Sequence, residues 1–229
     1  MMMPSFFRVA VTWKTAFPGA SAGILAMRNV ANPKDHPELD RLKDDLENWL
    51  RAQYSGSTRA DINALPIIRA YHDYYSTFKK TYHVQLQLES IVIKGKTIPN
   101  VAALVEAMFI AEVKNLLLTA GHDLDTVQPP VLLDVSNGSE RYILLNGQQQ
   151  VLKPNDMMIS DTQGVISSVI YGPDQRTRIT PQTRRVLFTV YAPPGIGGQV
   201  VHDHLMDIQS NVLLITPEAE VESLAVYGA

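Results

Sequence analysis

The stretch from Asp174 to Arg185 is the part of this sequence most suited to binding an anion. It reads DQRTRITPQTRR and holds four arginines and one aspartate, a local charge of +3 (4 − 1). Arginine contacts phosphate or carboxylate with two donors at once, and threonine hydroxyls add neutral donors. The candidate ligand-binding residues here are Arg176, Thr177, Arg178, Thr180 and Arg184. The pattern indicates a site for a phosphate-bearing RNA end or for the carboxylate of a small ligand. The alternative is a solvated turn whose arginines pair with neighbouring acids.

His122 and Asp123 are the candidates for proton-transfer chemistry. They follow Gly121 at a predicted helix-to-strand junction, and a histidine near an acid is a common general-base arrangement. Adjacent residues in a sequence rarely face each other, however, and no serine nucleophile accompanies them. Asp123 capping a turn is the competing interpretation.

Glu106 lies beside the apolar stripe of a predicted helix. If buried, it would be a carboxylate with a shifted pKa, able to contact a substrate amine. If exposed, it would be an ordinary helix glutamate.

His202, Asp203 and His204, followed by Asp207, form the most metal-like cluster, in which His204 and Asp207, three residues apart, could bind one ion. On a helix, residues two apart point about 200° from each other, so the two histidines cannot bind the same ion. The sequence has no cysteine, which excludes disulfides and thiolate ligands. We therefore favour a solvated helix face and predict no metal and no cofactor.

The aromatic run Tyr71, Tyr74, Tyr75 and Phe78 precedes Lys79 and Lys80. Aromatic rings interleaved with lysine can stack on unpaired bases. The spacing of these four rings is also that of a helix face packed in a core, and we favour the core. No glycine-rich phosphate-binding motif is present.

Several helices are predicted in the first half of the chain. The apolar spacing predicts helices over 35–54, from an Asp61 N-cap to Phe78, and over 100–118. The segment ending at Lys94 and Gly95 fits a strand or a helix, and we prefer a helix. A first strand is expected at Phe6–Val11, and residues 17–33 resemble a loop with one buried element.

The second half is rich in turns and short apolar runs, which predicts strands. The runs are VLLDV, RYILL, DMMIS, VISSVIY and RRVLFTVYA. The glycines at 195–198 introduce a last helix to about Gln209, followed by an edge strand at Val212–Ile215 and an acidic tail. Helices before strands, without βαβ alternation, predict an α+β fold. Its layered, sandwich-like β core would come from the C-terminal half and be covered by helices of the N-terminal half.

The composition is that of a globular protein. The chain has 229 residues, 45% hydrophobic and 19% charged, with a formal net charge of −3. This balance predicts one domain over 1–229 and argues against non-specific coating of nucleic acid. No signal peptide or membrane-spanning run is recognised, so a cytoplasmic location and no membrane partner are expected.

An ordered set of motifs resembles the B3/B4 editing domain of the phenylalanyl-tRNA synthetase β subunit, most clearly over 61–194. The motifs are Val105-Glu106, Gly121 to Asp125, Leu145-Asn146-Gly147, Leu152 to Asp161, and Thr183 to Phe188. The resemblance implies a B3/B4-like fold and a role with tRNA. It also implies that Glu106, Arg176 and Arg178 face a common pocket.

The resemblance also reveals what is missing. The family's editing histidine aligns with Ala120 and its closing glutamate with Thr189, so the editing mechanism does not transfer residue by residue. The first hypothesis is a tRNA- or aminoacyl-tRNA-binding protein, with deacylation of mischarged tRNA as its possible activity. The alternative is a pocket protein for a small amino-acid-like ligand that has lost RNA binding and editing. The oligomeric state stays open.

Overall fold

An eight-residue strand, β2 (Ser21–Arg28), lies inside a four-stranded antiparallel sheet. The computed structural model describes residues 6–228; residues 1–5 and 229, which the domain prediction includes, lie outside the described part. The strand order of this sheet is β11 (Glu220–Gly228), β2, β10 (Arg185–Ala192) and β3 (Thr119–Asp123). Ser21 through Met27 are all buried. The small residues that resembled a loop therefore form a strand covered on both faces.

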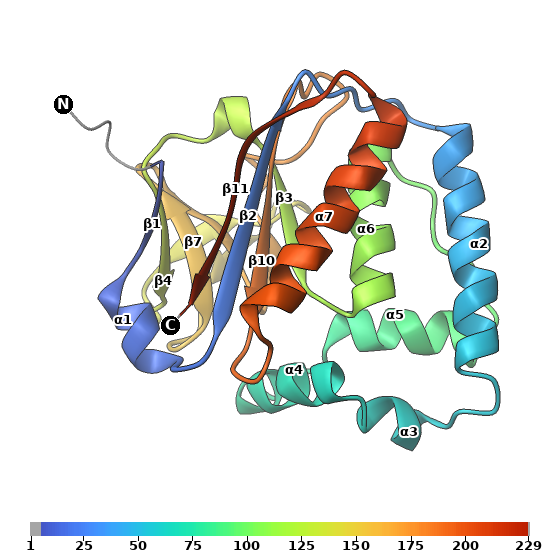
Figure 1. The fold of residues 1–229 in the computed structure, drawn as a ribbon. Helices are drawn as coiled ribbons and strands as arrows, with labels where there is room; N and C mark the ends of the chain where they lie inside the picture. The colour runs from blue at the N-terminus through green and yellow to red at the C-terminus, as the bar shows by residue number, and fades with distance from the viewer. Residues whose placement is uncertain (1–5, 229) are drawn as a thin grey trace.

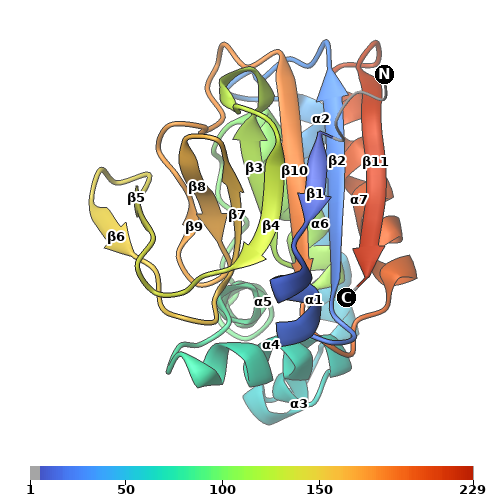
Figure 2. The same cartoon turned by 90° about the vertical axis from the view of Figure 1, so that its left-hand side faces the viewer.

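The second sheet has five strands and faces the first (Figures 1 and 2). Its order is β1 (Phe7–Val9), β4 (Val131–Val135), β7 (Met157–Asp161), β8 (Gly164–Ser168) and β9 (Gly172–Pro173). A separate hairpin is formed by β5 (Arg141–Ile143) and β6 (Gln149–Val151). Between residues 6 and 228, β1 with β4 is the only parallel strand pair, so the sheets are not of the doubly wound parallel kind.

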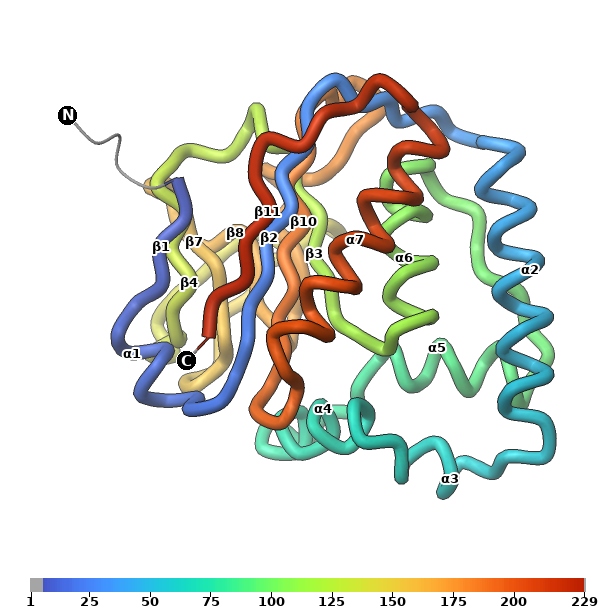
Figure 3. The backbone as a smooth tube through the Cα atoms, in the orientation of Figure 1, coloured from blue at the N-terminus to red at the C-terminus, as the bar shows by residue number. Residues whose placement is uncertain are grey.

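Helices cover the outer face of the four-stranded sheet (Figure 1). Two of them, α6 (Ala103–Asn115) and α7 (Gly198–Ile215), pack on this sheet, and α2 (Pro37–Gln53) packs outside α6. The backbone in Figure 3 then shows α3 (Arg59–Asn63), α4 (Pro66–Thr77) and α5 (His83–Val92) closing one end of the molecule. The short elements are α1 (Val11–Ala16) and a 3-10 turn at Leu124–Thr126. No helix in the described part is long and apolar enough to cross a membrane.

Three local predictions are corrected by this arrangement. The last helix continues through Val212 to Ile215, so the predicted edge strand at that place is wrong; the acidic tail forms β11 instead. The N-cap of α3 is Thr58, with Asp61 completing its capping box. A new helix then begins at Pro66, because proline fits a first turn but interrupts a continuing helix.

The predicted α+β fold with a layered β core is confirmed. Some of its strands and helices, however, come from the other half of the chain than predicted. Strands β1 and β2 come from the first half of the chain, and the covering helix α7 comes from the second. The preferred helix at α5 is also observed. The predicted helix over 100–118 ends at Asn115, because Leu116 takes a left-handed φ of 61° before the chain enters β3.

The contact between β2 and α7 generates a stability prediction. A Cβ on Gly23 would lie 2.6 Å from Val201 Cγ1 and 2.9 Å from Leu205 Cδ1. Gly23→Ala is therefore expected to reduce the free energy of unfolding by about 1–3 kcal/mol through overpacking. Urea denaturation measures this, with Gly197→Ala as the control because its Cβ would meet open space. Equal stability of the two variants would contradict the close helix-to-strand packing.

Candidate functional site

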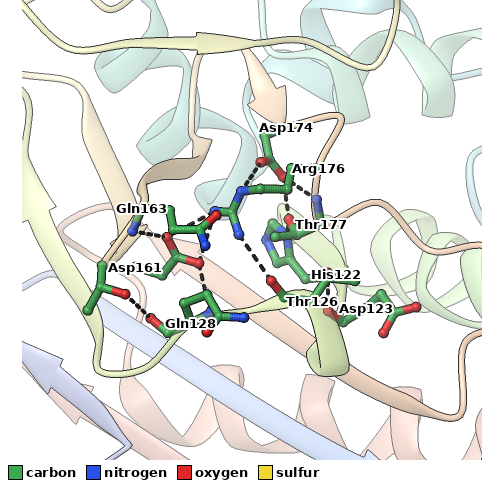
Figure 4. A network of polar contacts seen from close by, with 10 residues as sticks. His122, Asp123, Thr126, Gln128, Asp161, Gln163, Asp174, Arg176 and Thr177 are labelled. Carbon is green, nitrogen blue, oxygen red and sulfur yellow. Dashed lines mark hydrogen bonds and ion pairs between the residues drawn. The ribbon is translucent and has the colours of Figure 1, made fainter.

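A buried chain of hydrogen bonds links β3 to the arginine-rich segment (Figure 4). The Thr177 hydroxyl donates to the Asp174 carboxylate, and the Thr177 backbone N–H donates to the same oxygen at 3.0 Å. His122 Nδ1 lies 2.8 Å from the Thr177 hydroxyl oxygen. Because that hydroxyl has only one hydrogen, His122 must donate from Nδ1. Its Nε2 therefore carries the lone pair.

His122 is held neutral in this position. Its side chain is fully buried, and burial, followed by the charge of Arg176, lowers its pKa to about 3. Nε2 has no hydrogen-bond partner among residues 6–228. A base with so low a pKa binds a proton poorly at neutral pH. The geometry thus favours His122 as an anchor for Thr177 over its predicted role as a general base.

Asp123 does not form a pair with His122. Its carboxylate accepts hydrogen bonds from the Thr183 hydroxyl at 2.7 Å and from the backbone N–H of Asp125 at 3.1 Å. Successive residues of a strand point to opposite faces, and Figure 4 shows the two side chains directed apart. Asp123 therefore caps the turn at Leu124–Thr126, which was the competing interpretation.

Arg176 forms an ion pair with a buried carboxylate. Its Nη2 lies 2.9 Å from both oxygens of Asp161, whose side chain is 0% exposed, and its Nη1 donates to the Thr126 carbonyl at 3.0 Å. The Asp161 carboxylate also accepts from the backbone N–H groups of Gln128 (2.9 Å) and Gln163 (2.8 Å). The expectation that Arg176 is a solvated ligand-binding arginine is thus corrected, because it neutralises a buried charge.

Arg178 and Arg141 are the exposed arginines of an adjacent cleft of about 330 Å³. Arg178 donates only to the Gln175 carbonyl, at 2.9 Å. Neither arginine forms an ion pair within the described part of the chain. The cleft is lined by Arg141, Tyr142, Ile143, Gln163, Gly164, Val165, Asp174, Gln175, Arg176 and Arg178. We name it the arginine cleft; its two unpaired guanidinium groups and two glutamine amides suit an anionic ligand.

Other predicted binding residues of the segment lie outside the arginine cleft. The Thr180 hydroxyl accepts from Gln182 N–H at 3.3 Å, and Arg184 donates to the carbonyls of Pro181 and Thr183. Neither Thr180 nor Arg184 lines the cleft, and Thr177 is buried beneath it. Only some of the hydrogen-bond donors of the arginine-rich segment therefore lie in the arginine cleft.

Glu106 is also absent from the arginine cleft. It is buried on α6, where it pairs with Lys43 Nζ of α2 at 2.7 Å and accepts from the Val101 N–H at 2.7 Å. Glu106 therefore links two helices. It does not line the arginine cleft with Arg176 and Arg178, so the predicted common pocket is not observed there. Glu106 thus faces α2, and Lys43 supplies the neutralising charge.

The metal-like cluster is divided. His202 is half-buried on the surface side of α7, whereas His204 is buried beside the Thr119 hydroxyl, and Asp207 pairs with Lys114. No group of three potential ligands with metal-binding geometry occurs in the part of the chain that the structure describes. The four rings of the aromatic run are buried in the core, which was the preferred interpretation.

Comparison with known families identifies the class of protein. The B3/4 domain model matches residues 69–199, more than half of the chain, so the chain belongs to the B3/4 domain family. Among solved structures, an N-terminal fragment of the phenylalanyl-tRNA synthetase β subunit from Pyrococcus horikoshii matches with 10% identity and a TM-score of 0.48. The match covers 97% of this chain and 54% of that one, so the chain spans about half of the fragment's length. No curated protein matches the sequence.

The two positions aligned with the family's histidine and glutamate are direct neighbours. Ala120 of β3 is the register partner of Thr189 of β10, and the Thr189 hydroxyl lies 3.5 Å from the Ala120 carbonyl. Both residues are buried and neither carries a titratable group. This pair therefore supplies no acid or base.

Three residues at the site were not predicted from the sequence: Arg141, Asp161 and Gln163. Arg141 belongs to a hairpin whose docking on β8 no local pattern encodes. Asp161 was recognised only as part of a family motif, and its pairing with Arg176 spans a turn and two strands. The spacing of Asp174 and Thr177, an acid followed three residues later by a hydroxyl, could have indicated their bond.

Arginine substitutions test the division between structural and free side chains. Arg176→Ala should lower the free energy of unfolding by about 1.5–3 kcal/mol, because the buried Asp161 carboxylate loses its charged donor. Arg178→Ala should change it by less than about 0.5 kcal/mol, as is usual for a surface substitution. Chemical denaturation of both variants decides this, and an Arg176→Ala variant as stable as wild type would show that the Asp161 pair is dispensable.

The buried pair of Glu106 and Lys43 predicts a larger loss. Glu106→Ala leaves the buried Lys43 ammonium with only the half-exposed Asp40, at 3.0 Å, as an ion-pair partner, and breaking a buried pair typically costs about 3–5 kcal/mol. Glu38→Ala, which removes an exposed partner of Arg41, is the matched control and should cost about 1 kcal/mol or less. A Glu106→Ala variant with unchanged stability and weakened ligand binding would instead support the predicted substrate contact.

Proposed function

We propose that this chain binds the acceptor end of a tRNA or of an aminoacyl-tRNA at the arginine cleft. The observation that carries the proposal is the pair of unpaired, exposed guanidinium groups of Arg141 and Arg178 at one concave site. Arginine is well suited to phosphate oxygens, and such contacts position a nucleic acid on a protein. Membership of the B3/4 family and the motif resemblance to a tRNA synthetase domain support RNA as the source of the phosphate.

The proposed contact with RNA is short. Arg185, which a long basic track would include, pairs with Glu222 at 2.7 Å and with Asp125 at 3.1 Å. Arg176 is likewise paired, and the net charge of the chain is −3. A terminal segment with a few phosphates fits this distribution better than an extended helix does.

Recognition without ester hydrolysis is the activity we propose. His122 is neutral with a pKa near 3, and Asp123 is bound to Thr183. Ala120 and Thr189 stand where the family has a histidine and a glutamate. A positioned water and hydrogen-bond donors would be needed for hydrolysis, and these residues supply no base for it. The predicted cytoplasmic location accords with a tRNA ligand and is part of the proposal.

A small carboxylate-bearing ligand, such as an amino-acid-like molecule, is the second candidate. It is favoured by the size of the arginine cleft, whose volume of about 330 Å³ falls in the usual range for small-molecule sites. Such a ligand would contact one guanidinium group or both, and its binding would depend only weakly on salt.

Binding of tRNA at several salt concentrations separates these candidates. Arg178→Ala and Arg141→Ala should each weaken binding of deacylated tRNA by about tenfold to a hundredfold, because each removes a charge-assisted contact worth about 1.5–3 kcal/mol. Each should also reduce the slope of log affinity against log salt by about one unit. Fluorescence anisotropy with labelled tRNA measures both quantities, and mischarged tRNA is titrated in parallel.

Arg69→Ala is the control, since Arg69 is an exposed arginine of α4 outside the cleft. It should leave affinity and slope unchanged. Absence of tRNA binding by the wild-type protein at low salt would end the RNA proposal. Binding of a free amino acid that depends only weakly on salt, and that Arg178→Ala weakens, would then establish the second candidate.

A further inference from the structure

A cleft of about 590 Å³ lies at the end formed by α4 and the residues preceding β7. It is lined by Phe17, Ala70, Asp73, Tyr74, Thr77, Phe78, Lys153, Pro154, Asn155, Pro193 and Pro194. Tyr74 and Phe78 are buried and Phe17 is half-buried, whereas Pro154 and Pro194 are exposed. The rings therefore form the floor and the prolines the walls. We name this site the ring cleft.

The floor of the ring cleft is rigid. The Phe17 and Tyr74 ring centroids are 5.7 Å apart, and those of Tyr74 and Phe78 are 5.3 Å apart. The Tyr74 hydroxyl donates to Asp156 at 2.7 Å and accepts from the Met157 N–H at 2.7 Å, so both ends of this side chain are fixed. A preformed apolar floor binds a flat ligand without first having to order its own side chains.

The rim of the ring cleft carries a lysine. Lys153 lines the cleft and donates to the Phe78 carbonyl at 3.0 Å, which places its ammonium at the edge with further donors available. Lys79 and Lys80 are exposed and directly follow Phe78. Neither of them lines the cleft, whose lining holds one cation, Lys153, and one acid, Asp73.

We propose that the ring cleft binds a nucleotide, with the base against the aromatic floor and the phosphate on the lysine rim. Every nucleobase offers two flat faces that pack on aromatic and apolar side chains, and its phosphate is drawn to lysine. This site is separate from the arginine cleft. Asn155, before β7, lines the ring cleft, and Gln163, after β7, lines the arginine cleft. The length of β7 separates these two residues by roughly 20 Å. The inference therefore does not depend on the proposed function of the arginine cleft.

Two probes measure what the base contributes. AMP and ribose 5-phosphate carry the same phosphate, and only AMP carries a base. Isothermal titration of the purified chain should show AMP binding at least tenfold tighter than ribose 5-phosphate. Phe17→Leu should weaken AMP about fivefold or more and leave ribose 5-phosphate unchanged. Phe109→Leu, which alters a half-buried ring on α6 outside the ring cleft, is the matched control and should change neither.

A second variant keeps the test sound if Phe17→Leu lowers stability. Lys153 is exposed, so Lys153→Gln should fold normally, and it should weaken AMP and ribose 5-phosphate alike. Thermal unfolding of each variant accompanies the titrations. AMP binding no tighter than that of ribose 5-phosphate, or AMP binding unaffected by both variants, would overturn the inference.

The source of the nucleotide and the independence of the two sites are tested in the same experiment. A single-stranded RNA tetranucleotide that binds more tightly than AMP, with Phe17→Leu weakening both, supports an RNA strand as the ligand; equal affinity supports a free nucleotide. Arg178→Ala should leave AMP binding unchanged. Loss of AMP binding in Arg178→Ala but not in Phe17→Leu would place the nucleotide in the arginine cleft, which overturns this inference while the proposed function stands.

Discussion

The neutralisation of one internal carboxylate, that of Asp161, organises the region around the arginine cleft. An ionised carboxylate taken out of water requires a partner and hydrogen bonds, and Arg176 together with two backbone N–H groups supplies them. Because Arg176 is fixed in this way, the segment that follows it is fixed too. Thr177 turns inward to Asp174 and His122, and Arg178 turns outward. The free guanidinium group at the cleft is thus a consequence of the paired one beside it.

The general architecture could be predicted from local patterns, and its connections could not. Helical spacing located α2 and α5, and turn residues separated the strands of the second half. The strand β2 was predicted only as one buried element within a loop, because its alanines and Gly23 resemble a loop. Gly23 is small for a different reason: Val201 and Leu205 of α7 lie against it. Val212 was misassigned because its apolar run fits an edge strand as well as a buried helix face. Short apolar runs do not distinguish these two structures.

The candidate site shows the same limit at the level of side chains. The arginine-rich segment was found from its composition, since local charge is visible in a sequence. Whether each arginine is free depends on acids that are distant in sequence, such as Asp161 for Arg176 and Glu222 for Arg185. Glu106 was expected to contact a ligand because the sequence does not show its partner Lys43, which is 63 residues earlier (106 − 43). Burial and pairing are properties of the tertiary structure. The sequence therefore indicates the chemistry of a charged site better than it identifies the residues that form it.

The position of β2 bears on how the chain is made. Its two neighbours, β10 and β11, come from the last quarter of the described sequence, and Ser21 pairs with Gly228. During synthesis, therefore, this apolar strand leaves the ribosome 157 residues (185 − 28) before the first of these two partners begins. Sheet pairing over such separations is slow, because a long loop must close before any contact compensates for the lost entropy. Both edges of β2 stay unpaired throughout that interval, and unpaired strand edges can pair with other unfinished chains.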